Sequence, residues 1–98
     1  MYDSTQDNIV FIEHWAKEHI EDPKGKTDEQ IKEIACQRQA IEDIKEFIYE
    51  SRPSSDLTDI LFEYIMECKR VSFSTSNGWI LNMFERKMGT AELIMESI

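Results

Sequence analysis

The sequence predicts an all-α fold: a small bundle of four helices, followed by a short fifth helix at the C-terminus. Glycine and proline, which interrupt helices, number only 3 and 2 among the 98 residues. In addition, apolar residues recur every three or four positions along most of the chain, which is the spacing of one helix face. A chain of this length forms a single domain, so residues 1–98 are expected to share one hydrophobic core.

The first helix is predicted over residues 5–21 and ends at the proline and glycine that follow it. The second helix begins after Thr27, because Thr27 and Gln30 match a capping box at a helix N-terminus. It continues to about Ser51 and is longer than the first and fourth predicted helices. We therefore expect it either to project beyond them or to pack along a second copy of the chain.

The third helix is predicted from about Asp56 to Val71, where closely spaced apolar residues give it a broad inner face. A fourth helix follows over residues 77–88. Gly89 and Thr90 are expected to end it and to separate it from the short fifth helix. The residues predicted on one side of that fifth helix are Ala91, Ile94, Met95 and Ile98.

The segment 72–78 interrupts the helical pattern and leaves one alternative open. Asn77-Gly78 is a frequent turn between two β-strands, so a hairpin could form around it. The alternation expected of a half-buried strand is absent after Gly78. Helical spacing is present there instead, and it favours the helix: Ile80, Met83, Phe84 and Met88.

The sequence indicates a cytoplasmic protein that does not enter membranes. No signal peptide is visible, and no apolar stretch approaches the roughly 20 residues needed to span a bilayer. Cys36 and Cys68 are interpreted as reduced, buried thiols on the inner faces of their helices.

The net charge of −9 argues against two classes of partner. Phosphate neutralisation by basic residues supplies much of the affinity for nucleic acid, so direct binding to nucleic acid is disfavoured. Anionic membrane surfaces are disfavoured for the same reason. An acidic chain is better suited to a protein partner with a basic surface.

No motif for catalysis, metal binding or cofactor binding stands out, and the sequence predicts a protein that is not an enzyme. His14 and His19 are five residues apart, whereas two metal ligands on one helix face need a spacing of three or four. Cys36 and Cys68 form no Cys-x-x-Cys pair. The chain also lacks a nucleophile elbow and a glycine-rich phosphate loop.

One enzymatic alternative comes from the carboxylates. All-α nucleotide pyrophosphohydrolases hold magnesium with acidic pairs on neighbouring helices, and Glu63 and Glu67 could form such a site with Glu42 or Glu46. Apolar residues occupy the predicted inner face of the third helix, which leaves Glu63 at its margin or outside. No cluster of basic residues for the phosphates is evident either.

The favoured hypothesis is a protein–protein interaction module, a small acidic regulator or inhibitor. The third helix carries a stripe of acids edged by an aromatic residue and a methionine that point away from its inner face. Charge would steer a basic partner towards this surface, and the apolar groups would anchor it. The predicted partner-binding residues are Asp56, Asp59, Phe62, Glu63, Met66 and Glu67.

Three variants of this hypothesis remain open. The acids could mimic DNA phosphates and block a nucleic-acid-binding protein. Alternatively, Phe62 and Met66 could close a structural homodimer, with the acids as an ordinary solvated face. The size and acidity are similar to those of many small regulators encoded by phages and mobile elements, although no motif names a family.

Overall fold

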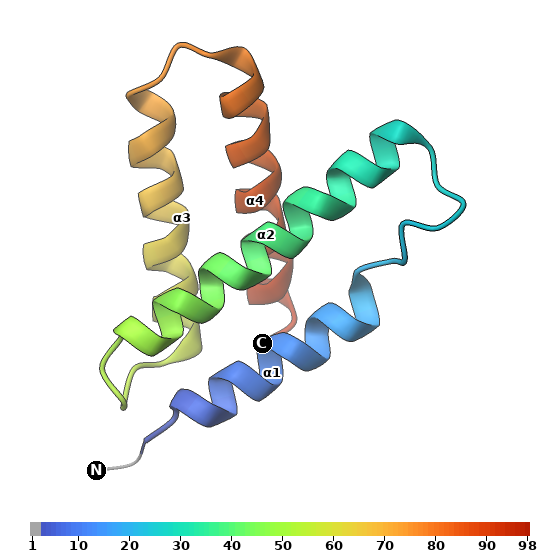
Figure 1. Ribbon diagram of the computed structural model, residues 1–98. Helices are drawn as coiled ribbons and strands as arrows, with labels where there is room; N and C mark the ends of the chain where they lie inside the picture. Colours follow the sequence, from blue (N-terminus) through green and yellow to red (C-terminus); the bar gives the residue numbers. More distant parts are fainter. Residues whose placement is uncertain (1–2) are drawn as a thin grey trace.

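Four helices and their short connections make up the computed structural model, which describes residues 3–98 (Figure 1). The helices are α1 (Thr5–His19), α2 (Asp28–Glu50), α3 (Leu57–Phe73) and α4 (Gly78–Glu96). No strand occurs among the described residues. The predicted all-α fold is therefore confirmed.

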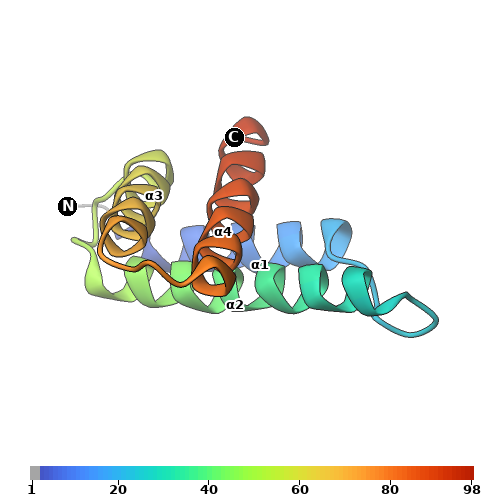
Figure 2. The same cartoon turned by 90° about the horizontal axis from the view of Figure 1, so that it is seen from above.

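The helices form two antiparallel pairs that cross each other. Figure 1 shows α3 and α4 standing side by side, with α2 running diagonally across them and α1 lying along α2. Helix α2 is the only one of the four that packs extensively against each of the other three. Seen from above, its N-terminal end extends past α3 and α4 (Figure 2).

The N-terminus of α2 has the predicted capping box. The Gln30 backbone N–H donates to Thr27 Oγ1 at 3.3 Å, and the Thr27 backbone N–H donates to Gln30 Oε1 at 3.0 Å. Beyond this turn, Ile34 is buried whereas Ile31 is 40% exposed, because this part of α2 projects beyond α3 and α4.

The core lies where the two helix pairs cross. Its fully buried side chains include Ile12 of α1, Ile44 of α2, Leu61 of α3 and Ile94 of α4. Trp15 of α1 is also buried, and its indole Nε1–H donates to Ser97 Oγ at 3.1 Å. This bond links α1 to the C-terminal end of the chain, 82 residues further along the sequence.

Helix α4 differs from its prediction, because it is one continuous helix and no separate fifth helix follows it. Gly89 lies inside the helix, and the Thr90 hydroxyl donates to the Arg86 carbonyl at 3.1 Å. Thr90 and Ala91 are buried against the core. Their burial outweighs the cost of placing a glycine within a helix, which is about 1 kcal/mol relative to alanine.

The connection between α3 and α4 is shorter than predicted and is not a hairpin of strands. Helix α3 continues to Phe73 instead of ending near Val71. Asn77 caps α4, because its Oδ1 accepts from the backbone N–H groups of Trp79 at 2.9 Å and Ile80 at 3.4 Å. This cap directs the chain into a helix immediately after the turn.

The two cysteines occupy different environments. Cys68 is buried as predicted, whereas Cys36 is only half-buried on the N-terminal half of α2, and both are unpaired thiols. Within residues 3–98, no helix has both the length and the apolar character needed to cross a membrane.

Candidate functional site

The outer face of α3 carries the predicted partner-binding residues, which we name the α3 ridge: Asp56, Asp59, Phe62, Glu63, Met66 and Glu67. Phe62 is 57% exposed and Met66 is 50% exposed. Asp59 and Glu63 are exposed beside them. The opposite face of α3 packs in the core. Phe62 and Met66 therefore point away from the core and are available to a partner.

Phe73 extends the apolar part of this face and was missed by the sequence analysis. It is 88% exposed at the last turn of α3. Phe62, Met66 and Phe73 are four and seven residues apart, so they lie on one stripe of the helix. The same spacing is present in the sequence, but the predicted connection 72–78 includes Phe73.

Two members of the α3 ridge have structural partners of their own. Asp56 caps α3, because its Oδ1 accepts from the Thr58 backbone N–H at 3.4 Å. Glu67 is half-buried and forms a two-bond ion pair with Arg70, including a bond from Arg70 Nε at 3.0 Å. The hydrogen bonds from Arg70 lower the pKa of Glu67. The carboxylates left for a partner are chiefly Asp59 and Glu63.

The four carboxylates of the alternative magnesium site do not share one cavity. Glu42 lies in the groove between α1 and α2, whereas Glu46 and Glu67 border a small cavity of about 140 Å³ between α2, α3 and α4. Glu63 borders neither of them. Among the described residues, no three His, Cys, Asp or Glu side chains are grouped in a way that could hold a metal ion.

A partly buried polar cluster adjoins the smaller cavity. Asp43 accepts hydrogen bonds from the Tyr64 hydroxyl at 3.1 Å and from Gln39 Nε2 at 3.0 Å, and it lies 3.3 Å from Lys87 Nζ. Burial raises the pKa of Tyr64 and that of Cys68 above their ordinary values. Lys87 is buried, so its ion pair with Asp43 joins α4 to α2 from within.

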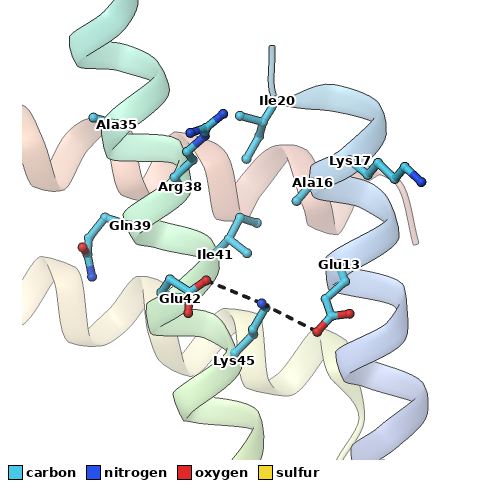
Figure 3. A pocket seen from close by; sticks show the side chains of 10 residues that line it. All are labelled: Glu13, Ala16, Lys17, Ile20, Ala35, Arg38, Gln39, Ile41, Glu42 and Lys45. Atoms are coloured by element: carbon cyan, nitrogen blue, oxygen red, sulfur yellow. Dashed lines mark hydrogen bonds and ion pairs between the residues drawn. The ribbon is translucent and has the colours of Figure 1, made fainter. Parts of the chain in front are cut away.

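A groove between α1 and α2 has a volume of about 600 Å³. Figure 3 shows Lys45 between Glu13 and Glu42, with its Nζ 3.7 Å and 3.5 Å from their carboxylates. Arg38 and Lys17 line the same groove. It is a shallow, mostly self-paired surface and offers no arrangement of catalytic groups.

Each of the two histidines contacts another residue of α1. His19 stacks on Trp15 with ring centroids 4.6 Å apart, and its Nδ1 lies 3.0 Å from the Trp15 carbonyl oxygen. His14 pairs with Glu18 at 3.0 Å. His19 is exposed at the end of α1.

Comparison with protein-family models, with curated proteins and with solved structures gives no match.

Proposed function

We propose that the chain is a non-enzymatic protein–protein interaction module whose α3 ridge binds a partner with a basic surface. The observation that carries this proposal is the exposure of Phe62 and Met66, at 57% and 50%, next to Asp59 and Glu63. A small acidic chain with one such face would act by occupying its partner's surface, as a cytoplasmic regulator or inhibitor does.

The energetics of such a contact divide between the two kinds of side chain. Complete burial of an exposed phenylalanine or methionine stabilises a complex by about 1.5–3 kcal/mol per side chain. The carboxylates of Asp59 and Glu63 contribute mainly to the rate of encounter and to the choice of a basic partner. Phe62 and Met66 are therefore the expected anchors.

The apolar stripe also distinguishes between the variants of this function. A mimic of DNA phosphates would need carboxylates, but it would gain little from a phenylalanine and a methionine in the middle of them. Phe62, Met66 and Phe73 favour a partner whose basic residues surround an apolar pocket. A nucleic-acid-binding protein is one member of that class.

The proposal is tested with the double variant Phe62→Ala, Met66→Ala in affinity capture from host lysate. A partner captured by the wild-type chain should be lost or reduced at least about tenfold, because burial of each of these side chains contributes about 1.5–3 kcal/mol. The matched control is Tyr49→Ala with Leu93→Ala, which removes side chains that are 65% and 50% exposed on other helices. Equal loss in the control variant would contradict the assignment to α3.

Solution mass separates this function from self-association. Light scattering on a size-exclusion column should give the 11.6 kDa of one chain across a range of salt concentrations. A stable dimer that the Phe62→Ala, Met66→Ala variant converts to monomers would instead assign the α3 ridge to a second copy of the chain.

A further inference from the structure

We propose that a cavity between the N-terminal halves of α2 and α4 binds a small, flat aromatic anion, such as a nucleoside monophosphate. The two helices cross near their centres and diverge towards their N-termini (Figure 1). A cavity of about 390 Å³ lies between them. This volume falls within the roughly 300–1,000 Å³ of sites that hold small ligands.

Both walls of the cavity are continuous helix faces. Residues at spacings of three and four lie on one side of a helix, and each wall follows that pattern. The wall from α4 comprises Trp79, Asn82, Met83 and Arg86. The wall from α2 comprises Glu29, Lys32, Cys36 and Gln39, with Ala35 beside them.

Trp79 provides a surface for an aromatic ring. Its side chain is 71% exposed and lines the cavity, so most of the indole is accessible to a ligand. Indole faces bind flat rings by stacking, and they do so with little regard to the identity of the ring. The soft, polarisable side chains of Met83 and Cys36 line the same cavity and suit the edge of such a ring.

Arg86 provides an oriented group for the anion. Its Nε donates to Asn82 Oδ1 at 3.0 Å, and its Nη2 lies 3.5 Å from Glu29 Oε2. These contacts hold the guanidinium while leaving further N–H donors for a phosphate or carboxylate. Lys32 adds an exposed ammonium group that has no carboxylate partner among residues 3–98.

The local charge fits an anion even though the chain as a whole is acidic. The net charge of the chain is −9, yet the cavity is lined by three cationic side chains and one acid. Lys87 forms an ion pair with Asp43, and Arg86 forms an ion pair with Glu29. Glu29 therefore competes with any bound anion, and its removal should strengthen binding.

Nuclear magnetic resonance tests this site with adenosine 5′-monophosphate as the probe. The chain has two indole N–H signals, one from Trp79 and one from Trp15, which is buried and bonded to Ser97. We expect the Trp79 signal to shift and saturate during titration while the Trp15 signal stays in place. Adenosine and inorganic phosphate, which each lack one half of the probe, should give much weaker shifts.

Two variants should change the affinity in opposite directions. Arg86→Met should weaken binding at least about tenfold, because a charge-assisted contact is lost. Glu29→Gln, in a side chain that is 78% exposed, should strengthen binding about two- to fivefold by removing the competing carboxylate. Arg38→Gln, in the groove between α1 and α2, is the matched control and should leave the affinity unchanged.

Indole-3-acetate, titrated in parallel, distinguishes a carboxylate from a phosphate as the natural anion. Saturable shifts of Trp79 with either probe support the site. The absence of such shifts with both probes, or a Glu29→Gln variant that binds no more tightly, would overturn it. The Phe62→Ala, Met66→Ala variant should bind both probes normally, so this site and the α3 ridge can fail independently.

Discussion

Asp43 shows how a single side chain can change its role between sequence and structure. In the sequence it belongs to a run of acids near the end of α2 and resembles a solvated residue. In the fold it accepts bonds from Tyr64 and Gln39 and pairs with Lys87. Two of these three partners lie on other helices, so the cluster depends on the crossing geometry, which helical spacing alone does not reveal.

The buried hydroxyl and thiol near Asp43 predict a loss of stability at high pH. Burial, followed by the nearby Cys68 and Asp43 charges, raises the pKa of Tyr64, and burial raises the pKa of Cys68. The unfolded chain therefore releases these protons at lower pH than the folded chain. The stability that the neutral groups contribute is fully present below about pH 9. It is lost as the pH rises towards the pKa values that the two groups have in the folded chain.

Urea unfolding between pH 7 and pH 11 measures this effect. The free energy of unfolding should fall above about pH 9, by at most about 1.4 kcal/mol per pH unit for each group. Tyr64→Phe should flatten the slope above about pH 10, and Cys68→Ala should flatten it above about pH 9. Tyr49→Phe, at a tyrosine that is 65% exposed, is the control. An unchanged slope in both core variants would contradict the argument.

At the scale of a helix, Gly89 offers a stabilising substitution. It lies within α4, and a Cβ built at this position has no atom within 4 Å. Gly89→Ala should therefore raise the free energy of unfolding by about 0.5–1 kcal/mol, because alanine loses less backbone entropy in a helix.

The matched control is Gly25→Ala in the turn between α1 and α2. Gly25 also has open space around it, but its φ is +77°, a conformation that alanine adopts with strain. The same substitution should therefore destabilise the chain. Urea unfolding of the two variants gives the comparison, and changes of the same sign would refute the explanation.

The start of α2, which side chains cap, was predictable from the sequence, whereas the C-terminal ends of α3 and α4 were not. The Thr27–Gln30 box placed the start of α2 correctly from the sequence. The continuity of α4 through Gly89 was not predicted, because it depends on the burial of Thr90 and Ala91 against other helices. The extension of α3 to Phe73 likewise followed no local signal that outweighed the serines around it.

At the scale of the whole molecule, the sequence predicted which helix faces are exposed better than it predicted the cavities between helices. The exposure of Phe62 and Met66 follows from helical periodicity, since the opposite face of α3 is strongly apolar. The cavity beside Trp79 and Arg86 is formed by two helices that diverge from their crossing. Its existence depends on an angle between elements, and that angle is not encoded in the pattern of either helix.

The central position of α2 has a consequence for the order in which the chain opens. Because α2 packs against each of the other helices, releasing its middle residues would expose every part of the core at once. Amide hydrogens between Ile41 and Ile48 should therefore exchange with deuterium only when the entire chain unfolds. The projecting turns near Ile31 should exchange much earlier.

Hydrogen exchange at increasing urea concentrations would show this ordering. The opening free energies of the amides between Ile41 and Ile48 should equal the free energy of global unfolding, whereas those near Ile31 should be lower. Faster exchange at Ile44 than throughout α3 and α4 would mean that the latter pair can persist alone. If instead the middle of α2 exchanges last, the four helices form one cooperative unit, and a ligand held by the early-opening end of α2 would slow local fraying there.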